Sequence, residues 1–393
     1  AYNTAGQITN VTIPGDRTIV FSYDTRQRLV RADCTRTGWI QNTYDNRDFL
    51  TRVDYQGGRW VRYEYDDAGK RTRMESSDGQ VLQYTYDATG SLKQVRTGDG
   101  VGQLLVEYTY DAAGRVLQEV RSNDTRTEYQ YNPAGFVTRI RHLAGATLQA
   151  EYVYTHDEAG LPLTAQTPEG LWRYTYDAEH QLVKFIRPNG DVVDIDYDAE
   201  GNRIRVRVNG VATEYGTDNQ NRYFSVGGRQ LGYDLDGNLT GTFTADHQPV
   251  VNEYDALGRL VRRQTSSGIA TFEYDALGNL TGMTENGVTR RFLLDGNRPI
   301  AEFGSDNQLL RRYWYANGLL GQQTSDQAQF FGYDMTGHTR LVTSANGSLV
   351  GQASYDPFGQ VLQTQGQLDS EFLFCGRLGQ RTLPGGGVLM GSR

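Results

Sequence analysis

The chain has 393 residues and a formal net charge of −8, with 39 Lys and Arg side chains against 47 Asp and Glu side chains. The excess of acidic residues argues against a nucleic-acid-binding domain, which would carry a basic surface. No apolar run reaches the roughly 18 residues of a membrane-spanning helix. The two cysteines, Cys34 and Cys375, lie near opposite ends of the chain and exclude a disulfide-stapled scaffold.

A Tyr-Asp pair recurs from one end of the chain to the other, and the first five pairs are separated by 21, 21, 21 and 24 residues. The tyrosines of these pairs are Tyr23, Tyr44, Tyr65, Tyr86, Tyr110, Tyr176, Tyr197, Tyr233, Tyr254, Tyr274, Tyr333 and Tyr355. Degenerate copies fill the longer gaps at Tyr129, Tyr152, Phe292 and Tyr313, and the repeat is most eroded around Tyr215. The period of about 18–24 residues indicates one repeat array rather than two unrelated domains.

Each repeat predicts a strand, a turn and a second strand. Aromatic residues stand two positions apart before the Asp, as do Tyr63 and Tyr65, which places both rings on one face of a strand, with Arg62 and Glu64 on the other. The Asp side chain can accept a hydrogen bond from the amide two residues on, and the glycine four residues after Tyr supplies a positive φ. A second alternating run follows, so one repeat predicts one β-hairpin and a connection.

We therefore predict an all-β chain of tandem antiparallel β-hairpins that forms a coiled sheet or a hollow shell, with helix below about 5% against a usual 30–35% or so. Native twist coils a strip of this many hairpins, and cross-strand tyrosine pairs stabilise it. Equivalent places on successive hairpins are expected for Tyr65, Tyr86 and Tyr110, and positive φ angles for Gly69, Gly90 and Gly114.

Two loops have the composition of ligand-binding sites. Gly98–Gly102 is rich in glycine like a phosphate-binding loop, but no Lys-Ser/Thr follows, so we interpret it as a lengthened hairpin loop. Asp234, Asp236 and Asn238 resemble the opening of a calcium loop. Because they occupy the turn of a repeat and lack the distal Glu, we interpret them as a turn rather than a metal site.

The histidines have no metal-ligand spacing; they are His142, His156, His180, His247 and His338. His180 stands in the glycine slot of its repeat, and His338 follows a repeat glycine. Cys375 with one of them could form a thiol nucleophile, but nothing in the sequence orients such a pair. The Asp residues recur on every hairpin, which is typical of structural turns rather than of one active site. The sequence thus assigns no catalytic, cofactor-binding or metal-binding residue.

The pattern Y-D-x-x-G-R/N-L resembles the YD repeat of Rhs proteins, of the C components of bacterial toxin complexes and of teneurins. The resemblance covers essentially the whole chain. From Tyr355 the sequence YDPFGQVL, then FLFCGRLGQ and a final VLMGSR, is similar to the start of the Rhs-associated core. We therefore predict a repeat array over residues 1–354 and the start of this core over 355–393, ending before the self-cleavage motif.

The resemblance implies a secreted shell in which a β-strip winds into a cocoon around a toxic C-terminal polypeptide. The expected partners are that cargo, other shell segments and proteins of a secretion apparatus, with no nucleic acid, membrane span or cofactor. Residue 1 begins inside a repeat, so a targeting segment is expected to have been removed or to lie upstream.

The family's core also cleaves its own chain with an aspartyl-protease-like arrangement, whose Asp residues would lie beyond Arg393, so the shell itself is not expected to be an enzyme. A basic residue assists in some members, and Arg381, or less favourably Arg377, is the nearest candidate. The sequence after Arg381 departs from the family pattern, which weakens this assignment.

Two other functions remain open. The repeats could form an extracellular adhesion or recognition module of the teneurin or wall-associated type, which binds glycan or protein through Tyr and Arg. A repeat-bearing hydrolase is the third and least favoured alternative.

Overall fold

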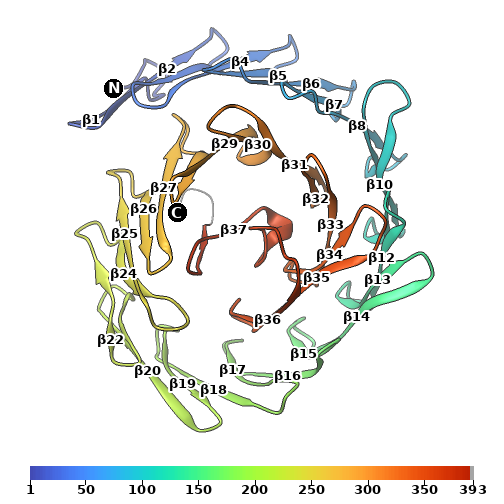
Figure 1. Ribbon diagram of the computed structural model, residues 1–393, viewed down its shortest axis with the longest axis vertical. Coiled ribbons are helices and arrows are strands. Elements are labelled where there is room, and N and C mark those ends of the chain that lie inside the picture. Colours follow the sequence, from blue (N-terminus) through green and yellow to red (C-terminus); the bar gives the residue numbers. More distant parts are fainter. Residues whose placement is uncertain (390–393) are drawn as a thin grey trace.

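The structure, a computed structural model, describes residues 1–389 and consists of β-strands that form a wound strip (Figure 1). Within this range the one helical element is the three-residue 3-10 helix η1 (Gly376–Leu378). The prediction of an all-β chain with very little helix is confirmed. No helix in the described range is long and apolar enough to cross a membrane.

The strands form two large sheets and one small sheet. The first sheet has 22 strands: β1 (Asn10–Ile13), β2 (Arg17–Tyr23), β3 (Leu29–Cys34), β4 (Gly38–Tyr44), β5 (Leu50–Tyr55), β6 (Trp60–Tyr65), β7 (Arg71–Ser76), β8 (Val81–Tyr86), β9 (Leu92–Thr97), β10 (Gln103–Tyr110), β11 (Val116–Arg121), β12 (Thr125–Tyr131), β13 (Val137–Ala144), β14 (Thr147–His156), β15 (Pro162–Thr167), β16 (Gly170–Tyr176), β17 (Leu182–Ile186), β18 (Val192–Tyr197), β19 (Arg203–Val208), β20 (Val211–Thr217), β21 (Tyr223–Val226) and β22 (Arg229–Gln230).

The second sheet has 14 strands: β23 (Gly232–Tyr233), β24 (Leu239–Phe243), β25 (Pro249–Tyr254), β26 (Leu260–Thr265), β27 (Gly268–Tyr274), β28 (Leu280–Glu285), β29 (Val288–Asp295), β30 (Arg298–Gly304), β31 (Leu309–Ala316), β32 (Gly318–Gln323), β33 (Ala328–Tyr333), β34 (Thr339–Ser344), β35 (Leu349–Tyr355) and β36 (Val361–Gly366). The small sheet pairs β37 (Arg381–Thr382) with β38 (Val388–Leu389). In the large sheets each strand pairs antiparallel with its neighbours in sequence, as β6 does with β5 and β7.

The Asp of each Tyr-Asp pair closes a turn with its side chain. In the repeat after β8, one carboxylate oxygen of Asp87 accepts the amides of Thr89 and Ser91, both at 2.9 Å. Gly90 adopts a φ of 86° and donates its amide to the carbonyl of Asp87. Gly69 and Gly114 have φ angles of 79° and 77°, so the predicted turn conformation is confirmed. The spacing of Asp and Gly in the repeat follows from this geometry.

The tyrosine of each pair ties its hairpin to the preceding one. A register shift precedes Tyr65, Tyr86 and Tyr110 in the same place, so these tyrosines are equivalent, as predicted. Such bulges bend a strand and increase its twist. The hydroxyl of Tyr86 then donates to the carbonyl of Arg71 at 2.8 Å. The same bond joins Tyr23 to Ile8, Tyr44 to Leu29, Tyr65 to Leu50, Tyr110 to Leu92, Tyr131 to Val116, Tyr176 to Pro162, Tyr197 to Leu182, Tyr233 to Tyr223, Tyr254 to Leu239, Tyr274 to Leu260, Tyr333 to Leu319 and Tyr355 to Thr339.

Replacing Tyr86 with phenylalanine is expected to lower the free energy of unfolding by about 1 kcal/mol, because the change removes one hydrogen bond and leaves the Arg71 carbonyl without this donor. The matched control is Tyr2→Phe, since Tyr2 is 71% exposed and its hydroxyl makes no hydrogen bond to the described residues. Urea denaturation of both variants measures the difference. Equal stabilities of the two variants would contradict a stabilising role for the tyrosine hydroxyl.

Replacing Gly90 with valine is expected to lower the free energy of unfolding by more than about 1 kcal/mol, because a β-branched residue is strained at a φ of 86°. A Cβ atom at this place would also collide with the ammonium group of Lys70, which would have to move. The control is Thr85→Val at an exposed position of β8. Thermal melts that superimpose for Gly90→Val and the parent chain would show that the turn tolerates a side chain.

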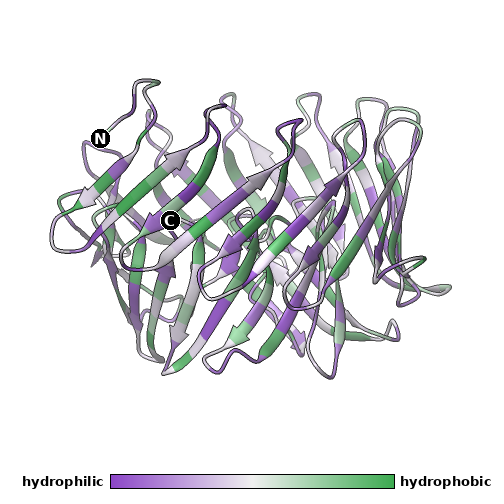
Figure 2. Ribbon diagram, turned by 90° about the horizontal axis from the view of Figure 1, so that it is seen from above, coloured by the Kyte–Doolittle hydropathy of each residue, from purple (hydrophilic) through white to green (hydrophobic). Residues whose placement is uncertain are grey.

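The strip winds through more than one complete turn, so that the later strands lie inside the earlier ones (Figure 1). We call β1–β24 the outer turn and β25–β36 the inner turn. Hydrophobic and hydrophilic residues alternate along the strands (Figure 2). In β6, Val61 and Tyr63 are buried on the concave face, whereas Arg62 and Glu64 are exposed, as the alternation predicts.

The inner turn packs against the concave face of the outer turn. Val61 and Tyr63 of β6 belong to one hydrophobic cluster with Leu293 of β29 and Phe331 of β33. Polar contacts accompany this packing: the Tyr63 hydroxyl and the Arg71 guanidinium both donate to the carboxylate of Asp295. Around β6, the tyrosine-bearing face of the outer turn is therefore covered by the chain itself.

Further polar contacts join the turns around the coil. They link Arg17 to Asp255, Arg312 to Asp78, Asn123 to Thr343, Gln149 to Gly347, His142 to Tyr333, Arg340 to Glu169 and Arg187 to Asp356. Because the first of these involves β2 and the last the end of β17, the two turns are fixed to each other along most of the outer sheet.

Candidate functional site: the interior of the coil

The last described residues of the chain lie inside the coil. Residues 367–389, which we call the interior segment, follow β36 and lie within the inner turn (Figure 1). They include η1, β37 and β38. β36 still pairs with β35 from Tyr355 to Gly351, so the sheet continues to Gly366. The division of the chain at residues 354 and 355 into an array and a core stays a prediction.

Hydrogen bonds to its backbone carbonyls hold the interior segment on the inner turn. The Thr339 amide and hydroxyl donate to the carbonyls of Leu373 and Phe372, respectively. Further along, the guanidinium of Arg263 donates to the carbonyls of Pro384 and Gly386 at 2.9 and 2.7 Å. Contacts to backbone oxygens hold the chain in place without depending on its side chains, apart from buried anchors such as Phe372, which is 1% exposed.

Arg381 and Arg377 both belong to this segment. Arg381 is buried, forms an ion pair with Glu371, and lies 4.2 Å above the ring of Phe292. Arg377 donates its Nε to the carbonyl of Asn317 at 3.3 Å. One amino group of Arg381, Nη2, is buried without a hydrogen-bond partner among the described residues. Arg381 contacts β29 and Arg377 contacts the connection between β31 and β32, so both arginines pack against the inner turn. Their assistance in chain cleavage stays a prediction.

His338 and Cys375 are brought together, although their spacing in the sequence gives no reason to expect it. The Cys375 sulfur lies 3.7 Å from Nδ1 of His338, and this nitrogen also accepts the Cys375 amide at 3.0 Å. Burial raises the pKa of the Cys375 thiol, with the charge of Asp334 adding to the effect, and burial lowers the pKa of His338. Both groups are thereby held neutral, whereas a cysteine nucleophile needs a thiolate.

His142 lies buried between the two turns. Its Nδ1 lies 3.0 Å from the Thr127 hydroxyl and its Nε2 3.1 Å from the Tyr333 carbonyl, an arrangement that a neutral ring with the proton on Nε2 satisfies. Burial and the nearby charge of Arg121 lower the pKa of His142 to about 3. The contact between the turns therefore depends on an uncharged imidazole.

Stability is expected to fall as the pH is lowered from 7 to 5, because the unfolded chain protonates His142 near pH 6.5 while the folded chain does not. The contribution of this group is about 2 kcal/mol over that interval. In His142→Gln that part of the pH dependence should disappear, whereas the control His247→Asn, at an exposed turn, should retain it. Urea denaturation at both pH values measures it, and identical pH dependence in the parent and His142→Gln would contradict the assignment.

Most of the remaining sequence candidates are parts of turns. Asp234 accepts the amides of Asp236 and Asn238 with one oxygen and the Asn238 side chain with the other, so its carboxylate is used as in the other repeats. Gly98–Gly102 is the loop between β9 and β10, as predicted. His180 has a φ of 64° in its glycine slot. His156 is the last residue of β14, and its ring lies tilted against that of Phe136. His247 lies in the turn before β25.

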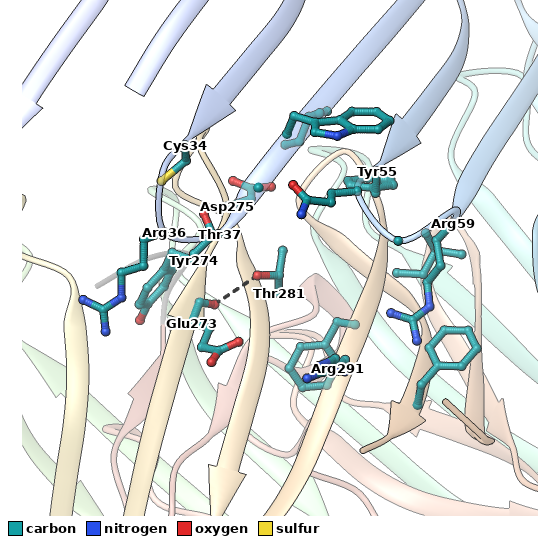
Figure 3. Close-up of a pocket in the computed structure, with 18 of the residues that line it drawn as sticks. Cys34, Arg36, Thr37, Tyr55, Arg59, Glu273, Tyr274, Asp275, Thr281 and Arg291 are labelled. Carbon is teal, nitrogen blue, oxygen red and sulfur yellow. Dashed lines mark hydrogen bonds between the residues drawn. The ribbon is translucent and has the colours of Figure 1, made fainter. Parts of the chain in front are cut away.

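A cavity of about 870 Å³ separates the two turns near the start of the outer turn (Figure 3). The ends of the hairpins of β3–β6 line it on one side, and β27–β30 line it on the other. Arg59, Glu273 and Arg291 contribute charged side chains to this cavity. No sequence pattern pointed to this cavity, because Arg59 and Arg291 come from repeats more than 200 residues apart, Arg59 just before β6 and Arg291 within β29.

A family model described as the teneurin YD-shell matches residues 1–105 and 169–383, and a model described as the RHS repeat matches residues 110–147. The tRNA3(Ser)-specific nuclease WapA of Bacillus spizizenii is 26% identical over 202 residues, which are 48% of this chain and 8% of the relative. The double-stranded DNA deaminase toxin A of Burkholderia cenocepacia is 25% identical over 277 residues, 62% of this chain and 19% of the relative. The chain thus spans less than a fifth of these relatives.

Solved structures share the fold over the whole chain. A crystal structure of TcdB2-TccC3 superimposes with a TM-score of 0.73 at 14% identity, covering 99% of this chain and 24% of that chain. The Tc holotoxin pore of Photorhabdus luminescens gives a TM-score of 0.61 at 14% identity, covering 99% of this chain and 26% of that chain. At this identity the likeness establishes the wound β-strip and nothing about activity.

Proposed function

The chain belongs to the teneurin YD-shell family, and on that premise we propose that it forms the wall, or part of the wall, of a shell that encloses the C-terminal polypeptide of a secreted toxin. In this proposal the shell is structural, and the toxic activity belongs to its cargo. The observation that carries the proposal is the course of the chain, which coils inward and ends its described part inside the inner turn.

The way in which the interior segment is held also supports this proposal. A polypeptide joined to this segment would start inside the wall, anchored by Arg263 and Thr339. Relatives named as a tRNA nuclease and as a DNA deaminase toxin each match part of this chain over a small share of their own lengths. If the wall is a common carrier whose cargo can be exchanged, proteins with different named activities are expected to share it.

Protease protection tests the proposal. A flexible Gly/Ser-rich reporter that contains one recognition sequence for a site-specific protease is fused after Arg393 in one variant and before Ala1 in another. Tyr2, beside the second fusion point, is 71% exposed, so this reporter serves as the exposed control. We expect cleavage of the C-terminal reporter to be slower by at least about tenfold, because it becomes accessible only when the wall opens.

Opening the coil should remove this protection. Asp295→Ala deletes the carboxylate that Tyr63 and Arg71 share across the two turns. In this variant the C-terminal reporter should be cleaved faster, while cleavage of the N-terminal reporter should not change. If both reporters are cleaved at the same rate in the parent chain, enclosure is wrong and surface recognition, as in an adhesion module, becomes the better account.

A further inference from the structure

The cavity between the two turns carries a charge imbalance at one end. Its charged side chains include Arg36, Arg59 and Arg291 as well as Glu273 and Asp275 (Figure 3). Two of these five have partners elsewhere. Arg36 forms an ion pair with Asp16 at 3.0 Å, and the carboxylate of Asp275 accepts two amides and the Asn279 side chain in its own turn.

The two remaining arginines are unneutralised. Within residues 1–389, neither Arg59 of the outer turn nor Arg291 of the inner turn forms an ion pair. Glu273 and Arg291 flank Gly282 on one rung of the inner sheet. The Glu273 side chain leans over this glycine, since a Cβ atom added at Gly282 would lie 3.1 Å from a Glu273 carboxylate oxygen. Among the described residues, this carboxylate forms no ion pair with Arg59 or Arg291. The cavity therefore presents two guanidinium groups from facing layers, neither of which has an ion-pair partner among residues 1–389.

The side chain of Arg59 is held in place by its neighbours. Its guanidinium lies 4.0 Å above the ring of Phe303, and one amino group donates to Asn307 at 2.9 Å. Burial and the neighbouring charge of Arg291 lower the pKa of Arg59, which shows that the two cations disfavour each other. An anion placed between them would relieve this repulsion, and little side-chain entropy would be lost in binding it.

From this geometry we propose that the cavity binds a small organic anion carrying phosphate or carboxylate groups, held by Arg59 and Arg291. Guanidinium groups bind such oxyanions through paired hydrogen bonds. A volume of about 870 Å³ exceeds that of a bare ion and fits a small organic molecule. Trp39 and Tyr55 line the same cavity and offer aromatic surface to the rest of that molecule.

Binding here would join the two turns. Arg59 belongs to the hairpin between β5 and β6, whereas Arg291 belongs to β29. A ligand that contacts both arginines is bound only while the turns lie against each other, so it favours the coiled state over any opened state. The ligand would thus stabilise the contact between the two turns, whatever the wall encloses.

The test uses pyrophosphate and citrate as probes of the two anion classes, with sodium chloride at matched ionic strength as the control for screening. Melting temperature and isothermal titration calorimetry are measured on the parent chain, Arg59→Gln, Arg291→Gln and Glu273→Gln. Arg205→Gln is the matched control, because Arg205 is a 42% exposed outer-turn arginine in an ion pair with Glu214. Each variant is compared with itself without a probe, which separates loss of binding from loss of fold.

We expect at least one probe to raise the melting temperature of the parent chain and of Arg205→Gln above the sodium chloride control. Arg59→Gln and Arg291→Gln should bind it at least about tenfold more weakly, the loss of a charged hydrogen bond. Glu273→Gln should bind it more tightly, because a repelling carboxylate is removed. A response to pyrophosphate alone identifies phosphate, and a response to citrate alone identifies carboxylate. No response, or an equal response in Arg291→Gln, would overturn the proposal.

Discussion

Replacing Arg340 with alanine is expected to lower the free energy of unfolding by about 3–5 kcal/mol, because a buried ion pair that loses one partner leaves the other charge uncompensated. The side chain of Arg340 is 7% exposed and that of Asp334 is 9% exposed. Arg340 binds both oxygens of Glu169 at 2.8 Å and donates to the Ala353 carbonyl at 2.7 Å. The change therefore leaves the Asp334 carboxylate and the Ala353 carbonyl without this partner. It also removes the contact between the turns that Arg340 makes with Glu169.

The matched control for this prediction is Arg26→Ala. Arg26 forms an ion pair with Asp48, but their side chains are 52% and 55% exposed, so its loss should cost about 1 kcal/mol or less. Urea denaturation followed by circular dichroism measures both values. Similar losses in the two variants would mean that the buried ion pair adds nothing to the attachment of the inner turn.

Replacing Phe331 with alanine is also expected to cost about 3–5 kcal/mol, through lost burial and the cavity left behind. Phe331 of β33 is 0% exposed and belongs to the cluster that joins the two turns. Because an inner-turn strand loses its anchor, we expect hydrogen exchange to quicken in β31–β35 more than in β15–β20.

Phe224→Ala is the control for this second prediction. Phe224 lies in β21 of the outer turn and is 44% exposed, so its loss should cost about 1 kcal/mol or less. Comparable destabilisation by the two variants would indicate that the turns adhere without this hydrophobic cluster. Faster exchange spread evenly over both turns would indicate one cooperative unit instead of an inner turn that loosens by itself.

The hairpins could be predicted from the sequence because their cause is local. The carboxylate of Asp87 reaches amides two and four residues ahead, and Gly90 supplies the φ angle that closes the turn. A repeat of about 21 residues carries all the information that this unit needs. The twist of such a strip also follows from general strand geometry, so the coil could be predicted along with the turns.

The contacts between the turns could not be predicted in this way. Asp295 meets Arg71, but many arginines stand at equivalent places in the repeats, and which of them meets a given carboxylate depends on how tightly the strip winds. The same accumulated curvature places His338 beside Cys375 and Arg59 across a cavity from Arg291. Small differences in twist, summed over many strands, determine which residues come into contact. No local sequence pattern predicts these contacts.

The tyrosine bonds between hairpins have a direction, which bears on how the protein is made. Each acceptor carbonyl precedes its tyrosine in the chain: Leu50 comes 15 residues before Tyr65, and Leu319 comes 14 residues before Tyr333. A chain emerging from the ribosome therefore completes each hairpin against one that has already been synthesised. The outer turn, which ends at Phe243, is synthesised before the inner turn, so the inner turn can pack against a surface that already exists.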